Sequence, residues 1–412
     1  MPEPGQDGRK ALHWLLFLAA FAVGVLPFWG VDRDFSDGVI GEWAYVTGRT
    51  EGMKLWLFES NWWGHYALYA LQMKIGALLG VPVWLVIKGW YTLVIAGLCF
   101  EAWRLARHYG FSSEQALLAA CLVACFPSYS IFYASSATHI GFVWAGLVGH
   151  RWLFWNGGWR RWAGALLTVM SFQVAANLVL LIVMGAVAWW LHRDRKSMAA
   201  LVFTIVSAVA FYLFISIWYP PVGEYAGYNK VLFPTSIANI LKVTVAAALF
   251  STWLVLLVAP LALMAGVGKW MEPSARLFGR VPGWLRSDAA RHIFICVLLV
   301  IGATLPYIAV GKGPPLFLVG PPRGGSMMWQ MYASTGGSFH IPAHAMMFRQ
   351  ATTMGVPFSL LAAALLGAAA AGFSARAGRR VFLAGAAAAL LLNAGLITYG
   401  HATRWNQALF DQ

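Results

Sequence analysis

The sequence contains very few charged residues. Asp, Glu, Lys and Arg make up 11% of its 412 residues, while 60% are hydrophobic and 15% are aromatic. A soluble domain usually contains about 25% charged residues, which cover much of its surface in water. The shortage excludes an ordinary soluble domain and predicts that membrane lipids cover a large part of this chain. The 22 tryptophans agree, since indole rings favour the boundary between headgroups and hydrocarbon.

Cysteines are also scarce, and no internal repeat stands out. All four cysteines lie inside apolar runs, which predicts helix packing rather than a disulfide framework (Cys99, Cys121, Cys125 and Cys296). Arg9 and Lys10 precede the first apolar run as in a signal peptide, but no small-residue cleavage site follows. We therefore interpret this run as an uncleaved first membrane span.

The basic residues are spread along the chain rather than gathered in one patch. The net charge of +14 comes from groups of two or three between apolar runs, so nucleic acid is not an expected partner. Short basic loops next to membrane spans usually face the cytoplasm. With a cytoplasmic N-terminus, the cytoplasmic segments hold 18 of the 29 basic residues, namely Arg9, Lys10, Arg104, Arg107, Arg151, Arg160, Arg161, Arg193, Arg195, Lys196, Lys269, Arg276, Arg280, Arg286, Arg291, Arg376, Arg379 and Arg380.

These patterns predict an all-α integral membrane protein that forms a single polytopic domain over residues 1–412. A span needs about 20 apolar residues, and about eleven fit the sequence, which places the N-terminus inside and the C-terminus outside. They begin near Ala11, Val81, Gln115, Thr138, Trp162, Val174, Met198, Ile237, Ile293, Gln350 and Val381.

The predicted topology requires that residues 62–79 do not cross the membrane. This segment includes His65, Gln72 and Lys74, and Pro82 follows it, so we expect an amphipathic helix on the outer membrane surface. The two short apolar runs on either side of Gln173 must then form a tight hairpin, because both of their outer ends are basic.

The first outer loop, which together with the interfacial helix covers residues 30–80, is rich in carboxylates. It holds six of the 15 acidic residues of the chain (Asp32, Asp34, Asp37, Glu42, Glu51 and Glu59). Carboxylates at this spacing beside a span could supply a general base for a lipid-borne substrate or ligate a divalent cation, Mg²⁺ or Mn²⁺. The alternative is a solvated acidic loop in which an Asp caps the next helix. No other cofactor is expected.

Two later outer loops carry further candidate residues. The first combines aromatic rings with an amine, in Tyr225, Tyr228 and Lys230, and suits either substrate contact or an interfacial aromatic belt. The second, a long basic loop over residues 312–349, holds cations that match phosphate oxygens. These cations are Lys312, Arg323, His340, His344 and Arg349. Metal binding by the two histidines is the weaker interpretation of that pair.

The order of these segments resembles the GT-C glycosyltransferases, polytopic enzymes that use polyprenyl-phosphate sugars. The resemblance is carried by the acidic loop, by His65-Tyr66-Ala67-Leu68-Tyr69, by residues 102–110 (AWRLARHYG), by Ser113-Glu114-Gln115-Ala116, and by Phe126-Pro127. Members similar to lipid-A aminoarabinose transferases and protein mannosyltransferases show an Asp-Glu pair, and two prolines before Leu-Tyr. Here Asp34-Phe35-Ser36-Asp37 and Tyr66-Ala67 stand in those places, which leaves the subfamily open.

This resemblance implies a transferase on the periplasmic face of a bacterial-type inner membrane, acting in the cell envelope. It would move a sugar from a polyprenyl-phosphate donor to a glycan, lipid or protein acceptor. Asp34 or Asp37, with Asp32 as a third candidate, would be the catalytic carboxylate. The cations of the basic loop would hold phosphate, and Glu42 and His65, with the tyrosines and Lys230 above, are further substrate-binding candidates.

Two other functions fit the same composition. A transporter or flippase for a lipid-linked or anionic substrate would need ionisable residues within the membrane, where the long spans offer only Lys88 and Lys242, both close enough to helix ends to snorkel. A membrane acyltransferase or polysaccharide polymerase would instead use His139, His340 and His344 as bases.

Overall fold

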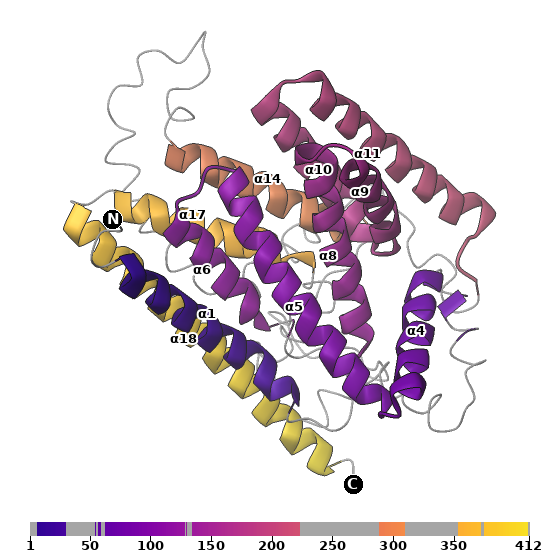
Figure 1. Cartoon of the computed structure of the whole chain (residues 1–412), viewed down its shortest axis with the longest axis horizontal. Helices are drawn as coiled ribbons and strands as arrows, with labels where there is room; N and C mark the ends of the chain where they lie inside the picture. Colours follow the sequence, from indigo (N-terminus) through magenta and orange to yellow (C-terminus); the bar gives the residue numbers. More distant parts are fainter. Residues whose placement is uncertain are drawn as a thin grey trace, which may run out of the picture.

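The computed structural model describes residues 6–29, 54, 57–58, 62–127, 129, 134–222, 288–309, 353–371 and 375–410, and within these ranges every regular element is a helix (Figure 1). Five helices are long and apolar enough to cross a membrane, namely α5 (Val83–His108), α10 (Ala175–His192), α11 with the π-turn after it (Arg195–Trp218), α14 (Asp288–Ala309) and α18 (Ala375–Phe410, of which Arg376–Thr398 qualifies). The chain therefore has the architecture of an α-helical membrane protein.

The remaining predicted spans that the structure describes are also helical, but shorter or less apolar. They are α1 (Gln6–Trp29), α6 (Ser113–Ala124), α8 (Ala134–Trp155), α9 (Trp159–Met170) and α17 (Gly355–Ala371). At a rise of 1.5 Å per residue, twelve residues reach about 18 Å, less than the about 30 Å of a hydrocarbon core, so α6 and α9 do not reach across one by themselves. The span expected near Ile237 lies outside the described residues, and the count of eleven stays a prediction.

Local sequence signals explain where several helices begin and end. Ser112 and Gln115 form a capping box at the start of α6, in which each side chain accepts a hydrogen bond from the other residue's backbone amide. The Asp194 carboxylate accepts from the Ser197 amide and opens α11. Gly80 ends α4 (Trp63–Leu79) with a φ of 64°, a left-handed conformation that glycine adopts without strain, and Pro82 then precedes α5.

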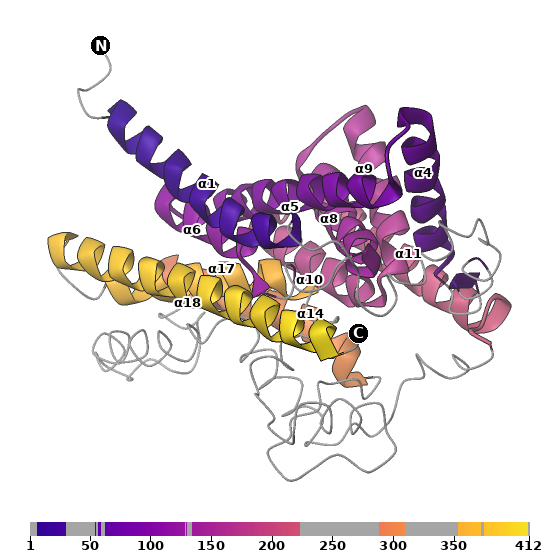
Figure 2. The same cartoon turned by 90° about the horizontal axis from the view of Figure 1, so that it is seen from below.

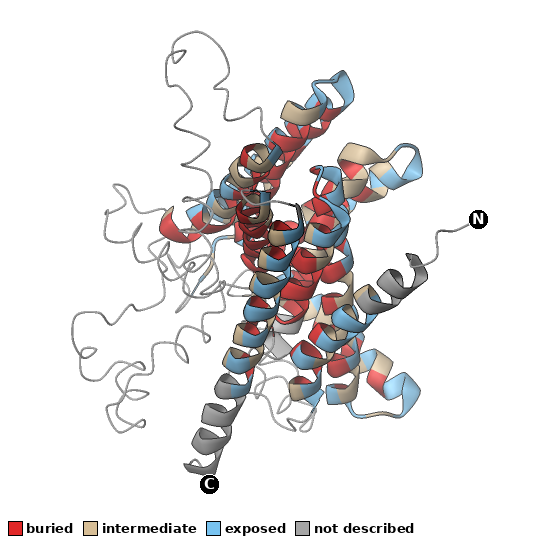
Figure 3. Ribbon diagram, turned by 90° about the vertical axis from the view of Figure 1, so that its left-hand side faces the viewer, coloured by how far each residue is buried: buried red, intermediate tan, exposed pale blue. Residues whose placement is uncertain are grey.

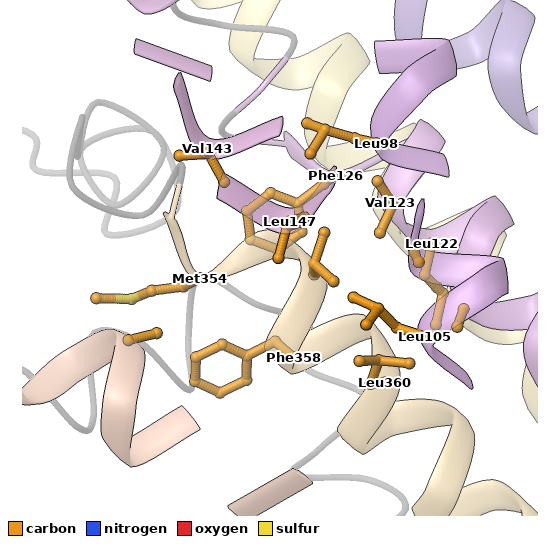
Figure 4. Close-up of a cluster of buried hydrophobic side chains, with 14 of the residues drawn as sticks. Leu98, Leu105, Leu122, Val123, Phe126, Val143, Leu147, Met354, Phe358 and Leu360 are labelled. Carbon is orange, nitrogen blue, oxygen red and sulfur yellow. The ribbon is translucent and has the colours of Figure 1, made fainter. Parts of the chain in front are cut away.

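The apolar core is built around α17, which packs against α6, α14 and α18. Its alanines Ala362, Ala363 and Ala364 are fully buried, so this Ala-rich segment serves close helix packing, as its composition predicts. Leucines and phenylalanines of α5, α6, α8 and α17 fill the space between these helices (Figure 4). Figure 3 shows that buried residues line the inward sides of the helices, while their outward sides are exposed. The first and last helices, α1 and α18, lie side by side (Figure 1).

The segment around Gln173 forms the predicted hairpin. α9 ends at Met170, a 3-10 turn, η1 (Ser171–Gln173), follows, and α10 begins at Ala175. The Arg161 guanidinium, near the start of α9, donates to the Lys196 carbonyl, which follows the end of α10, at 2.9 Å. The two basic ends of the hairpin therefore lie together, and Gln173 is at the opposite end.

The basic ends of several helices meet in one region, which we call the basic end. Trp155 at the end of α8 stacks on His108 of α5 and donates to His192 of α10. His292 of α14 stacks on Phe111 in the α5–α6 turn. The basic end also contains the Arg161–Lys196 contact and the ion pair between Arg379 of α18 and Glu114 of α6. Helix ends far apart in the sequence thus bring their positive charges together.

Candidate functional site

The other ends of the same helices meet in a second region, which we call the loop end. The Tyr91 hydroxyl at the start of α5 donates to the Tyr129 carbonyl, just after α6, at 2.8 Å. Tyr307 near the end of α14 and Thr353 before α17 share a hydrogen bond of 3.2 Å. The Trp29 indole at the end of α1 donates to Thr92 of α5. The residues that flank both the acidic loop and the long basic loop therefore belong to this end.

Helix α4 closes the loop end. It stands at a steep angle to α5, at the end where α5 begins (Figure 2), and its position relative to a membrane surface stays a prediction. Its buried residues form one stripe, at a spacing of three or four, that contains polar side chains (Gly64, His65, Tyr69, Gln72 and Gly76). Leucines such as Leu71 and Leu78 are exposed on other sides. Apart from the exposed Lys74, the polarity of α4 is thus the reverse of that of a helix in a soluble protein, with polar groups facing the protein.

Two histidines meet where α4 packs on α8. The rings of His65 and His139 lie 5.8 Å apart, and Phe142, one turn further along α8, lies 4.9 Å from His65. The ring of Trp62, directly before α4, lies 5.6 Å from that of His65. His65 is buried and His139 is partly exposed. This pair can donate and accept protons or hydrogen bonds beside an aromatic wall.

The turn η1 holds the start of α4 through polar contacts. The Gly64 amide donates to Oε1 of Gln173 at 3.0 Å. Asn177, at the start of α10, donates to the carbonyls of Phe142 and Ser171. These bonds tie α4, α8, η1 and α10 together beneath the histidine pair, so the hairpin at Gln173 positions the site.

Lys88 is a buried cation at this end. Its ammonium donates to the carbonyl of Trp29, the last residue of α1, at 2.9 Å, and lies 4.6 Å from the ring centre of Trp84. Its exposed fraction is 5%, so the side chain is buried within the protein. Because the acidic loop begins directly after Trp29, Lys88 fixes the point at which that loop leaves the helix bundle.

Of the site residues predicted from the sequence, His65 is described and lies at the loop end. The others fall outside the described residues, namely Asp32, Asp34, Asp37, Glu42, Tyr225, Tyr228, Lys230, Lys312, Arg323, His340, His344 and Arg349. Among the residues that the structure describes, no group of three His, Cys, Asp or Glu could hold a metal ion. The four cysteines are free and buried.

Sequence reasoning missed several polar residues of the described bundle. Gln173 was noted only as a turn, although its amide holds α4, and Lys88 was considered only as a residue close enough to a helix end to snorkel. The spans also contain a charged pair, because Glu101 within α5 binds Arg151 of α8 through two hydrogen bonds of 2.6 and 2.8 Å. The sequence held one signal for these residues. A polar side chain within an apolar run is energetically costly in a membrane, so such a residue usually has a structural or functional role.

Comparison with known proteins identifies no relative of this chain. No family model matches the sequence, and neither a curated protein nor a solved structure matches it. The functional argument therefore rests on the residues and their geometry.

Proposed function

We propose that the protein is a membrane glycosyltransferase that works at its loop end. One observation carries the proposal. The residues that flank the acidic loop and those that flank the basic loop belong to the same end of the bundle, and buried Lys88 and the histidine pair also lie there. Carboxylates and phosphate-binding cations attached to the same end suit transfer from a phosphate-linked donor. The family resemblance of residues 32–161 adds support.

The topology that goes with this function has about eleven spans, with the N-terminus inside and the C-terminus outside. The gathering of helix-terminal cations at the basic end supports it, since such cations usually face the cytoplasm. The loop end then faces the periplasm of a bacterial-type inner membrane. The reversed polarity of α4, with leucines outward and His65 and Gln72 inward, suits a helix whose outer side touches lipid at that surface.

In the proposed reaction, Asp34 or Asp37, with Asp32 as the third candidate, takes a proton from the acceptor hydroxyl. The resulting oxygen attacks the anomeric carbon of the donor sugar, and the bond from that carbon to the phosphate oxygen breaks. The polyprenyl phosphate leaves with the electron pair, and Lys312, Arg323 and Arg349 with the loop histidines stabilise its charge.

Separate Asp34→Asn and Asp37→Asn variants test the proposal. A lost general base typically lowers the rate by about 10²- to 10⁴-fold, so we expect one variant to lose transfer from a polyprenyl-phosphate sugar to that extent. Glu51→Gln in the same loop is the control and should keep its activity. Full activity in both aspartate variants, with both proteins folded, would show that the base assignment is wrong.

One observation favours a second candidate function, a membrane acyltransferase or polysaccharide polymerase. His139, the base expected for that chemistry, lies beside His65 at the loop end. A His139→Gln variant separates the two candidates, because the glycosyltransferase proposal gives His139 no proton to carry. A rate loss as large as that of the aspartate variants would favour the second candidate.

A further inference from the structure

The buried side of α4 contains an amide that has no hydrogen-bond partner among the described residues. Gln72 is 2% exposed, and neither its oxygen nor its nitrogen is bonded. Buried polar groups are nearly always paired with protein, water or a ligand, and leaving an amide unpaired destabilises the fold. A leucine would fill the same space without that cost. The amide is therefore better explained by something that it binds.

The stripe of α4 shows what Gln72 faces. Gly64 and His65, two turns earlier, contact Gln173 and His139. Gly76, one turn later, lies against the first residues of α5. Gln72 lies between them on the same side of the helix, so it faces the junction of α4, α5, α8 and η1.

Other groups around this junction are also unsatisfied. The Nε2 amide nitrogen of Gln173 has no hydrogen-bond partner, although its Oε1 accepts from Gly64. The indole nitrogen of Trp90, which lies over Gly141 of α8, also lacks one within the described residues. The junction thus offers two amide nitrogens, one indole nitrogen and one amide oxygen, with the partly exposed rings of Trp62 and Trp90 around them.

The chemistry of these groups selects the ligand class. Neutral amides can donate to and accept from hydroxyl groups, whereas a phosphate or carboxylate would call for cations, and this part of the junction presents none among its unpaired groups. Flat aromatic rings with a polar edge suit the apolar face of a sugar ring. We propose that the junction of α4, α5, α8 and η1 binds a neutral sugar ring. This inference rests on the proposed transferase function and gives it a substrate subsite.

The direct test is sugar binding by the full chain in lipid nanodiscs, which avoids sugar-based detergents. The probes are free neutral hexoses and N-acetylhexosamines, followed by saturation-transfer NMR. We expect saturation of at least one sugar, and roughly tenfold weaker binding in Gln72→Leu and in Gln173→Leu, because one hydrogen bond is worth about a factor of ten. Leu71→Met, on the exposed side of α4, is the matched control and should bind as the unaltered protein does.

Thermal unfolding of Gln72→Leu separates binding from a structural role. We expect an unchanged or higher melting temperature, since leucine replaces an unpaired amide. A lower melting temperature would mean that the amide has a structural partner, and it would overturn the inference. The inference would also be overturned if the unaltered protein bound no sugar, or if Gln72→Leu and Gln173→Leu both bound sugar as tightly as the unaltered protein does.

Transfer kinetics show whether the bound sugar belongs to the donor or to the acceptor. They also test the sugar site independently of the proposed catalytic base. A raised KM of Gln72→Leu for the lipid-linked donor would place the donor sugar in the junction, and a raised KM for a glycan acceptor would place the acceptor there. The Asp34→Asn and Asp37→Asn variants should bind free sugars normally. Sugar binding together with full transfer by both aspartate variants would overturn the base assignment and leave the sugar site standing.

Discussion

The two ends of the helix bundle satisfy their polar groups in different ways. At the basic end, charged side chains find partners on neighbouring helices or in their own turn, as in the Glu101–Arg151 pair and the Asp194 cap. The hydroxyl and amide of Ser197 donate to the Asp194 carboxylate and lower its pKa. At the loop end, the buried groups are mostly neutral, and Gln72 and Gln173 keep unpaired atoms within the described part of the chain.

The difference lies in charge, since the unpaired groups at the junction of α4, α5, α8 and η1 are neutral amides and an indole. Paired charges at the basic end stabilise the ends of α5, α6, α8, α11 and α18, although Tyr109, His150, Arg291 and His292 there each keep a buried polar atom without a partner among the described residues. Unpaired amides at the loop end cost stability and persist where something else binds them. Variants at one end of the bundle, compared with matched variants at the other end, test this difference.

Labelling with a membrane-impermeant maleimide should give an all-or-none difference between the two ends. Gly157→Cys lies in the exposed α8–α9 turn and Gly80→Cys in the exposed α4–α5 turn, and at both positions a new side chain meets open space. The native cysteines are buried, so background labelling should be low. In intact spheroplasts we expect labelling at Gly80→Cys alone, because the proposed topology places the basic end in the cytoplasm.

Lysed membranes supply the control for this experiment, since both cysteines should then react. Labelling of both positions in intact spheroplasts would contradict the proposed topology. Labelling of Gly157→Cys alone would invert it.

Breaking the ion pair of the basic end should have the next largest effect. Glu101 is 2% and Arg151 13% exposed, so Glu101→Gln leaves a buried guanidinium without its counter-charge. Removal of one partner from a buried pair typically costs about 3–5 kcal/mol in the free energy of unfolding. Reversible denaturant unfolding in mixed micelles measures this loss, and sugar binding at the loop end should persist in the folded fraction.

Glu114→Gln at the same end is the matched control. Its 3.8 Å pair with Arg379 is about half exposed, so its loss should cost less than about 1 kcal/mol. Equal losses in the two variants would show that burial does not distinguish the pairs. The double variant Glu101→Leu/Arg151→Met should recover most of the stability, since both charges are then gone.

The sequence predicts the helices better than it predicts the site. Hydrophobic runs and caps are local, so the helices from α4 to α11 begin within about four residues of the expected positions, which is the usual uncertainty. α14, α17 and α18 begin about five or six residues away from them. The hairpin at Gln173 also follows from charge at its two ends. The contacts from Lys88 to Trp29 and from Gly64 to Gln173 join residues 59 and 109 positions apart. Such pairs depend on how helices pack, and no local pattern in one sequence reveals them.

A smaller loss of stability than that of Glu101→Gln is expected at the loop end, for Lys88. In Lys88→Met the chain keeps a side chain of similar length, but the Trp29 carbonyl loses a charged donor, which should lower the free energy of unfolding by about 1–2 kcal/mol. Lys196→Met at the basic end is the control, because Lys196 is exposed and its contact with Arg161 uses only its backbone carbonyl.

Transfer activity is the more informative measurement for this pair of variants. Lys88 fixes the residue that precedes the acidic loop, so its loss should lower the transfer rate by more than the unfolded fraction explains, while Lys196→Met should not. Normal transfer by folded Lys88→Met would mean that the exit of the acidic loop does not set the reaction geometry. The loop end would then bind substrate without using α1 to position its carboxylates.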